Sequence, residues 1–130
     1  MNRIVFSLII GLISITAFAQ STSEAPTQNI STDNTVVYRL FSTRNKYTFI
    51  KLNTRNGQMW QVQWGIENKY RFESILSNVS LVNKDEEKDG RFFLYPTTNI
   101  YNFILLDQID GRTWQVQWGN EEDRDVVRIY

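Results

Sequence analysis

The hexapeptide WQVQWG occurs twice in this chain of 130 residues, at Trp60–Gly65 and Trp114–Gly119, and the two copies hold all four tryptophans. The sequence around each copy is duplicated as well. When Trp60 is set on Trp114, YTFIKLNTRNGQMWQVQWG (47–65) and YNFILLDQIDGRTWQVQWG (101–119) are identical at eleven of nineteen positions. We call this ungapped match the repeat alignment. Such a repeat is typical of proteins in which equivalent units bury a common core.

The duplication defines the domain organisation. We expect one domain, residues 36–130, built from two repeats at 36–76 and 90–130. Residues 83–90, NKDEEKDG, carry mixed charges and are predicted to form a solvated loop between the repeats.

Outside the hexapeptide the match between the repeats is weaker. Upstream, Arg39 and Phe41 match Arg91 and Phe93 if the second repeat has two extra residues. Downstream, the repeat alignment sets Phe72 and Ile75 opposite Val126 and Ile129.

Each repeat reads as β-strands. The segments YTFIKL and YNFILL are β-branched and aromatic, and WQVQW alternates between apolar and polar residues. Between them, Asn-Gly and Asp-Gly indicate hairpins in which Gly57 and Gly111 adopt a positive φ. If the second loop is the four residues 108–111, Leu105 faces Trp114. A three-residue loop with a bulge would reverse which residues share a side of the sheet.

Flanking strands would make each repeat a four-stranded antiparallel meander, which cannot bury its aromatic side alone. We therefore expect an all-β fold of about eight strands, with two tandem meanders forming a pseudo-twofold sandwich or flattened barrel. The Trp-Val-Trp side of each repeat is expected to supply most of the shared core. Four tryptophans and two glycines are thus predicted to be structural: Trp60, Trp64, Trp114, Trp118, Gly57 and Gly111.

The N-terminus predicts export. Arg3, an uncharged apolar stretch and the sequence Ala-Phe-Ala before Gln20 form the pattern of a secretory signal peptide at residues 1–19. The apolar stretch is shorter than a membrane span and is diluted by small polar residues. Residues 20–35 are rich in Ser, Thr and Asn and are predicted to be a disordered tether.

The amino-acid composition limits the cellular compartments and the classes of partner that suit this protein. The chain has no cysteine, so neither disulfides nor the acylated cysteine of a lipoprotein are available, and we expect a periplasmic or secreted protein. Removal of residues 1–19 leaves 13 basic and 14 acidic residues. This balance gives no electrostatic footprint for nucleic acid, and no stable membrane span is expected after signal cleavage.

The stretch GRFFLYPTTNIYNFILLDQIDGRTWQVQW resembles a module of small secreted or envelope proteins of Bacteroides and relatives, often duplicated, with the pattern LYPTxNxYxFILLDxxxGxxWQVQW. The resemblance covers both repeats and is stronger in the second, since the first lacks the LYP and has Asn53 in place of Asp. The resemblance implies the compartment and the duplicated architecture, and it assigns no activity. The hairpin also looks like that of quinoprotein-type propeller blades, but two repeats cannot close a ring, so no cofactor is expected.

Catalysis is not expected. Without histidine or cysteine, the common nucleophile-base pairs are missing. The best acidic candidates, Asp107 and Asp110, correspond to Asn53 and Asn56 in the first repeat, which favours a role in the turn. The acidic run 121–123 offers oxygen ligands for calcium but no spaced loop signature, so we expect no metal and no catalytic residue.

The composition and the tether favour an exported, non-enzymatic binding module for a protein or a glycan. The alternatives are a structural envelope subunit and a periplasmic inhibitor or immunity-type protein, and a homo-oligomer is possible, since Ile50, Leu52, Ile104 and Leu106 make the glutamine side half apolar. Aromatic and amide side chains are the candidate ligand or partner surface: Tyr47, Tyr95, Tyr101, Gln61, Gln63, Gln115 and Gln117.

Overall fold

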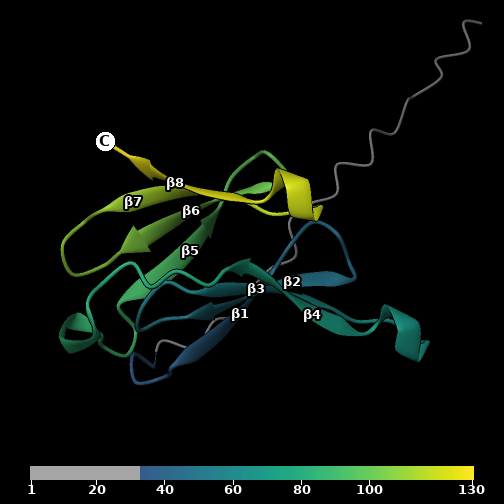
Figure 1. The fold of residues 1–130 in the computed structure, drawn as a ribbon, viewed down its shortest axis with the longest axis horizontal. Helices are drawn as coiled ribbons and strands as arrows, with labels where there is room; N and C mark the ends of the chain where they lie inside the picture. Colours follow the sequence, from purple (N-terminus) through teal and green to yellow (C-terminus); the bar gives the residue numbers. More distant parts are fainter. Residues whose placement is uncertain (1–32) are drawn as a thin grey trace, which may run out of the picture.

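The computed structural model describes residues 33–130 and is all-β (Figure 1). The predicted signal peptide and most of the predicted tether lie outside these residues. Eight strands form two separate four-stranded antiparallel meanders, with strand orders β1-β2-β3-β4 and β5-β6-β7-β8. The predicted fold of two meanders is confirmed, and of the two arrangements it is the sandwich that forms, not the flattened barrel.

Both repeats contain the same elements. The strands of the first repeat are β1 (Tyr38–Ser42), β2 (Thr48–Asn53), β3 (Met59–Gln63) and β4 (Phe72–Ser77). Those of the second repeat are β5 (Phe92–Pro96), β6 (Asn102–Asp107), β7 (Thr113–Gln117) and β8 (Asp125–Ile129). Three short 3-10 helices lie in the connections: η1 (Asn68–Tyr70), η2 (Lys84–Glu86) and η3 (Glu121–Asp123).

The central hairpins have the four-residue loops that the sequence suggested. In the second repeat, the amide of Asp107 donates to the carbonyl of Arg112, and the amide of Gly111 donates back to the carbonyl of Asp107. Gly57 and Gly111 have φ values of 84° and 80°, a region that suits glycine because it has no Cβ. Leu105 faces Trp114 across the resulting register, as predicted.

The first strands of the two repeats, β1 and β5, are not matched in the way that the upstream sequence suggested. Tyr38 pairs with Asn53, and Phe92 pairs with Asp107, so β1 and β5 follow the repeat alignment without a gap. The predicted match of Arg39 with Arg91 across two extra residues is therefore wrong. The position of each flanking strand is set by its hydrogen bonds to the central hairpin. The shared arginine and phenylalanine are therefore a chance identity between residues that are not structurally equivalent.

The last strand of each repeat is also displaced from the predicted match. Val62 pairs with Glu73, and the equivalent Val116 pairs with Val126, so it is Glu73 that corresponds to Val126. The expected match of Phe72 with Val126 is off by one position, because the connection before β8 is one residue shorter than the one before β4.

The two sides of each meander are named here by their side chains. The front face carries the Trp-Val side: Leu40, Phe49, Trp60 and Val62 in the first repeat, and Leu94, Phe103, Trp114 and Val116 in the second. The back face carries the Ile-Leu-Gln side: Ile50, Leu52 and Gln61 in the first repeat, and Ile104, Leu106 and Gln115 in the second.

The core joins unlike faces. Ile50, Leu52 and Met59 of the first back face are buried together with Leu105 and Val116 of the second front face. The repeats therefore stack front to back. A twofold axis between the sheets would instead have brought equivalent faces together. Each sheet therefore has one face inside the sandwich and one face outside it.

This stacking decides which tryptophans are buried. Trp114 and Trp118 are each only 6% exposed, as predicted. The prediction is wrong for the first repeat, where Trp60 is half-buried and Trp64 is 46% exposed. Their side of the first sheet faces away from the second sheet, so the front face of the first repeat does not supply the shared core.

Candidate functional site

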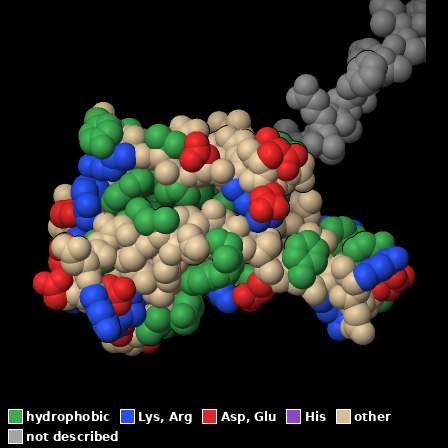
Figure 2. Space-filling model, in the orientation of Figure 1, with side chains coloured by type: hydrophobic (Ala, Val, Ile, Leu, Met, Phe, Trp, Pro, Cys, Tyr) green, Lys and Arg blue, Asp and Glu red, His purple; other side chains and the backbone are tan. Residues whose placement is uncertain are grey.

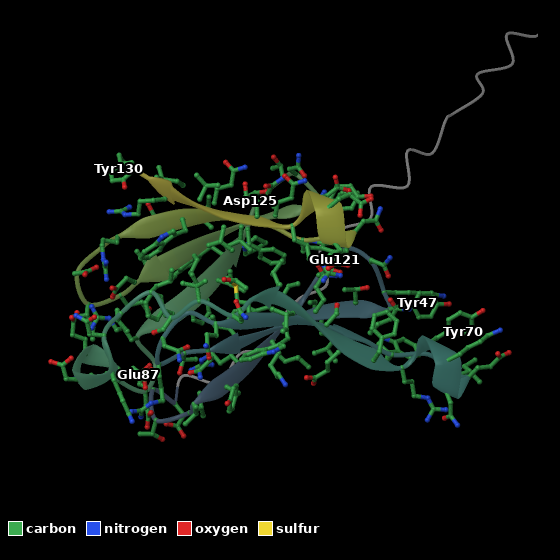
Figure 3. The ribbon with its side chains drawn as sticks, in the orientation of Figure 1. Tyr47, Tyr70, Glu87, Glu121, Asp125 and Tyr130 are labelled. Atoms are coloured by element: carbon green, nitrogen blue, oxygen red, sulfur yellow. The ribbon has the colours of Figure 1, made fainter. Side chains whose placement is uncertain are left out.

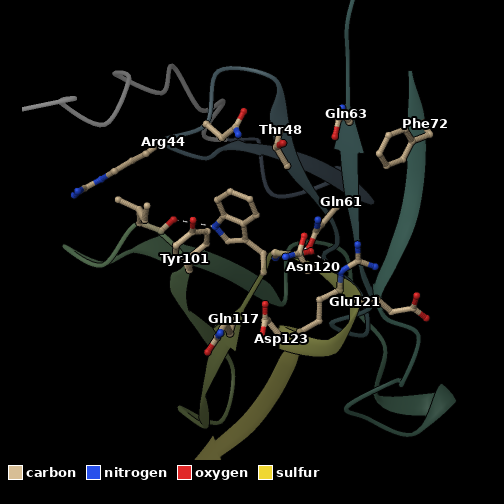
Figure 4. A pocket seen from close by; sticks show the side chains of 15 residues that line it. Arg44, Thr48, Gln61, Gln63, Phe72, Tyr101, Gln117, Asn120, Glu121 and Asp123 are labelled. Atoms are coloured by element: carbon tan, nitrogen blue, oxygen red, sulfur yellow. Dashed lines mark hydrogen bonds between the residues drawn. The ribbon is translucent and has the colours of Figure 1, made fainter. Parts of the chain in front are cut away.

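A cleft lies between the two repeats at one end of the sandwich (Figure 4). Its volume is about 850 Å³. β3 contributes Gln61 and Gln63, while β7 and the connection after it contribute the opposite wall. The side chains that give this cleft its chemistry are Arg44, Gln63, Phe72, Tyr101, Gln117, Asn120, Glu121 and Asp123.

Two contacts between the repeats hold the walls of the cleft. The Gln61 side-chain oxygen accepts a hydrogen bond of 2.9 Å from the amide of Gly119. The Arg124 guanidinium donates to the carbonyl of Gly119 and, across the sandwich, to the carbonyl of Ile75, both at 2.9 Å. Both contacts join a side chain of one repeat to the backbone of the other, so they connect the two walls of the cleft.

An aromatic pair forms one corner of the cleft. The rings of Tyr101 and Trp118 lie 5.3 Å apart with an interplanar angle of 51°. The indole nitrogen of Trp118 donates to the carbonyl of Ile100 at 3.0 Å, which fixes the ring. Tyr101 is exposed and Trp118 is buried, so the tyrosine ring is the part of the pair that a ligand can reach.

The first repeat has an equivalent corner at a different place. The rings of Tyr47 and Trp64 lie 5.2 Å apart, and the Trp64 indole donates to the carbonyl of Lys46 at 2.7 Å. Here the connection between β3 and β4 extends away from the sandwich, with η1 at its tip (Figures 1 and 3). We call this projection, residues 64–71, the arm.

A second pocket lies at the base of the arm. Its volume is about 500 Å³, and it is lined by Tyr47, Gln63, Gly65, Ile66, Glu67 and Tyr70. Ile66 is 89% exposed. Lys69 lies over the ring of Tyr70, with its amino group 5.0 Å from the ring centre. Hydrophobic, basic and acidic side chains thus lie close together on the arm (Figure 2).

The structure separates the predicted ligand surface into three places. Gln61, Gln63, Gln117 and Tyr101 line the cleft, although the oxygen of Gln61 is already used by Gly119. Tyr47 lines the arm pocket, together with Gln63.

The other two candidates lie elsewhere. Tyr95 and Gln115 belong to the second repeat, and the pairing of Tyr95 with Ile104 and of Ile104 with Gln115 puts both on its back face. They do not line the cleft or the arm pocket.

The two acidic candidates of the hairpin lie outside the cleft. Asp107 is fully buried, and its carboxylate accepts hydrogen bonds from the Arg91 guanidinium at 2.9 to 3.1 Å. Burial alone would raise the pKa of Asp107, but the hydrogen bonds from Arg91 and from the turn amides lower it to about 2. A carboxylate held in this way is ionised and fully engaged, which is the behaviour of a structural group.

Asp110 has the turn role that its counterpart in the first repeat suggested. Its carboxylate accepts from the amide of Arg112 at 3.1 Å, and the Asn56 side-chain oxygen accepts from the amide of Gln58 at 3.0 Å. Equivalent turns in the two repeats are therefore closed by a carboxylate in one case and by an amide in the other.

Neither a cation site nor a membrane span is found in residues 33–130. The acidic residues there, including the run 121–123, do not gather into a group of three that a metal ion could bridge. The helices of this region have three residues each, so none has the length or hydropathy of a membrane-crossing helix.

Sequence reasoning missed the arginines that organise the connections. Arg71 donates to the carbonyl of Gly65 at 2.9 Å, as Arg124 does to Gly119. The repeat alignment misses this pair by one position, so a one-residue gap after the second WQVQWG would have identified them. Arg44 and Phe72 carry no such signal, because they reach the cleft only through the packing of one repeat on the other.

A comparison with known proteins finds no family model, curated protein or solved structure that matches this chain. The proposals below therefore depend on the geometry of the two sites and on the exposed faces of the sheets.

Proposed function

We propose that this protein is an exported, non-enzymatic binding module that recognises a glycan in the cleft between its repeats. The observation that carries the proposal is the cleft itself. Its volume of about 850 Å³ lies within the range of small-molecule sites, roughly 300–1,000 Å³. Its lining combines amides, carboxylates and an accessible aromatic ring.

The chemistry of the lining suits a ligand rich in hydroxyl groups. The side chains of Gln63, Gln117 and Asn120 each offer donors and an acceptor, while Glu121 and Asp123 offer acceptors only. A sugar hydroxyl both donates and accepts, so it can satisfy this mixture, whereas an apolar ligand would leave polar groups unpaired at a cost of about 1–3 kcal/mol each.

The exposed ring of Tyr101 adds the apolar part of such a site. It lies against Trp118, whose indole nitrogen is already bonded to the backbone, so the tyrosine is held as a flat surface at the edge of the cleft. A pyranose ring presents C–H groups on one side, and an aromatic ring is a suitable surface for them.

The groups that are present support a binding role more than a catalytic one. The chain has no histidine and no cysteine for nucleophile activation. The carboxylate with the most strongly shifted pKa, Asp107, is buried against Arg91 outside the cleft. We therefore assign the acidic residues of the cleft to hydrogen bonding of a ligand.

A glycan array probed with the exported protein tests the proposal. We expect binding to a restricted set of bacterial or host glycans, and a loss of at least about tenfold in affinity for Tyr101→Ala and for Gln117→Ala, which is about 1.4 kcal/mol. The matched control is Tyr95→Ala, which removes an exposed tyrosine from the back face of the second repeat. Absence of glycan binding, or equal loss in the control, would contradict the assignment.

The arm supports a second candidate, an inhibitor-type protein that binds a protein partner. Tyr47, Trp64, Ile66 and Tyr70 are all exposed on or beside a projecting element. Aromatic residues of this kind are typical anchors of protein interfaces. Capture of a defined envelope protein by the wild type and its loss in Ile66→Asp, with glycan binding unaffected, would favour this candidate.

A further inference from the structure

Two faces of the sandwich are left uncovered, although their residues are those of a core. The front face of the first repeat exposes Tyr38, Leu40 and Ile75, and Leu40 is 53% exposed. The back face of the second repeat exposes Tyr95, Val127 and Ile129, and Val127 is 50% exposed. Exposed apolar faces of this kind commonly mark sites of association.

The first uncovered face matches a face that is buried in the same molecule. On the front faces, Leu40, Phe49, Trp60 and Val62 are identical to their partners in the repeat alignment: Leu94, Phe103, Trp114 and Val116. These partners are buried in the sandwich. The uncovered front face therefore retains the apolar residues of the face that packs inside.

The second uncovered face shows the same relation. Ile104, Leu106 and Gln115 on the outer back face are identical to Ile50, Leu52 and Gln61, which are buried against the second repeat. The internal interface thus uses one front face and one back face. The molecule keeps one further face of each kind.

We propose that the protein associates head to tail with a second copy of itself, the front face of the first repeat of one copy packing on the back face of the second repeat of the other. This contact reproduces the front-to-back stacking that already joins the repeats within the chain. In repeat proteins, stability is supplied by such contacts between neighbouring units. The proposal is independent of the glycan assignment.

The contact is heterologous, because each copy uses a different surface. Such a contact leaves a free face of each kind at the two ends of the assembly, so it can add further copies or close into a ring. An isologous dimer would instead use one of the two faces twice.

Charged residues set the strength of the contact. On the outer front face, Lys51 and Glu73 take the places of the buried Leu105 and the partly buried Val126, and they form an ion pair of 2.7 Å. The amino group of Lys51 also lies 5.0 Å from the centre of the Trp60 ring. Burying this pair costs desolvation energy that a leucine and a valine would not require, so association is weaker than the internal packing.

The back face of the second repeat has no charge at its centre. Its side chains at the middle of β6 and β7 are Ile104, Leu106 and Gln115, and Asp125 lies at the end of β8. The central charges of the contact are therefore confined to the first repeat. The double change of Lys51→Leu with Glu73→Val introduces the residues of the second repeat and leaves neither charge unpaired. It is expected to tighten association by about tenfold or more.

Sedimentation velocity of the exported protein at increasing concentration tests the proposal. The wild type is expected to gain mass with concentration. Leu40→Lys blocks the front face, and Ile104→Lys blocks the back face; each variant alone is expected to remain monomeric. Mixed together, they retain one intact face of each kind and are expected to form a pair that does not grow further.

Two controls keep the result interpretable. Ile66→Lys places the same charge on the arm, away from both faces, and is expected to associate like the wild type. Val127→Lys blocks the back face at a more exposed position and replaces Ile104→Lys if the latter unfolds by circular dichroism. A monomeric wild type together with a monomeric double variant, Lys51→Leu with Glu73→Val, would overturn head-to-tail association. A singly blocked variant that still dimerises alone would overturn it as well.

Discussion

The two repeats have nearly the same hairpin sequence and the same strand pairing, but they bury opposite faces. Trp114 of the second repeat is in the core, whereas Trp60 at the equivalent position is half-buried on an outer face. Local sequence determines which residues share a side of the sheet. The neighbouring sheet determines which side is buried, because only the face that meets another sheet loses its water.

The hairpin turns differ in a similar way. Asn53 and Asp107 both accept a hydrogen bond from the amide two residues later, at 3.0 Å. In the second repeat, Arg91 lies against the carboxylate and the pair is buried; its counterpart in the repeat alignment is Val37. One turn is therefore closed by an amide, and the other depends on a buried ion pair.

The largest expected difference between the repeats is at the equivalent tryptophans. Trp114→Ala is expected to cost about 3–5 kcal/mol of folding free energy, because the ring is buried between Phe92 and two arginines. Trp60→Ala is expected to cost about 1 kcal/mol, since its ring contacts mainly Tyr38 and Lys51 on the outer face. Urea unfolding of a non-associating background, Leu40→Lys, measures both; equal losses would contradict front-to-back stacking.

The second prediction concerns the buried carboxylate. Asp107→Asn is expected to cost about 3 kcal/mol, because it leaves the buried Arg91 without its main counter-charge. The reverse comparison, Asn53→Asp, places a carboxylate at a buried position of a turn that has no equivalent arginine, so it is also expected to destabilise the fold. Chemical denaturation at neutral pH measures both values.

The ion pair of Asp107 with Arg91 is expected to make the folding stability depend on pH. Since the pKa of Asp107 is lowered from 3.8 to about 2, its stabilisation is complete above the unfolded pKa and is lost as the pH falls from about 5 toward 2. The loss amounts to about 2 kcal/mol in the wild type. It is expected to be absent in Asp107→Asn, so a variant that retains the full acid destabilisation would assign it to other carboxyl groups.

These comparisons show which parts of the fold the sequence could predict. Alternation in WQVQW and the Asn-Gly and Asp-Gly turns are local signals, so the meanders, the loop length and the facing of Leu105 and Trp114 could be inferred. The choice of buried face could not, since Trp60 and Trp114 lie in identical hexapeptides and differ only in their neighbours.

The cleft was predictable only in part. Gln61, Gln63, Gln117 and Tyr101 were identified from the duplicated segment, and all four line the cleft. Which other residues join them depends on how far each connection extends beyond its sheet. The connection after β3 in the first repeat projects as the arm, whereas the connection after β7 in the second repeat forms a wall of the cleft. The two connections differ in length by one residue, and the alternation of apolar and polar residues does not predict the effect of that difference.

The fourth prediction separates the two turn glycines. A Cβ at Gly57 would lie 2.7 Å from the Leu81 side chain, whereas no atom lies within 4 Å of a Cβ at Gly111. Both have a positive φ, so Gly111→Ala is expected to cost about 1 kcal/mol and Gly57→Ala about 2 kcal/mol. Thermal unfolding of the two variants compares them, and equal costs would show that the Leu81 side chain moves aside and that the positive φ alone sets the cost.

The smallest expected effect is at Asp110. Its turn hydrogen bond from the amide of Arg112 is the one that Asn56 makes in the first repeat, and an asparagine can accept it equally well. Asp110 also pairs with the Arg112 guanidinium at 2.8 Å, but the carboxylate is 40% exposed, so the pair contributes less than about 1 kcal/mol. Asp110→Asn is therefore expected to change the free energy of unfolding by less than about 1 kcal/mol and to leave glycan binding intact. Denaturation midpoints and array binding of this variant, measured beside Asp107→Asn, separate the two carboxylates of one turn. If Asp110→Asn kept its stability but lost a catalytic turnover present in the wild type, Asp110 would be a catalytic group, and the assignment of this protein as a binding module would fail.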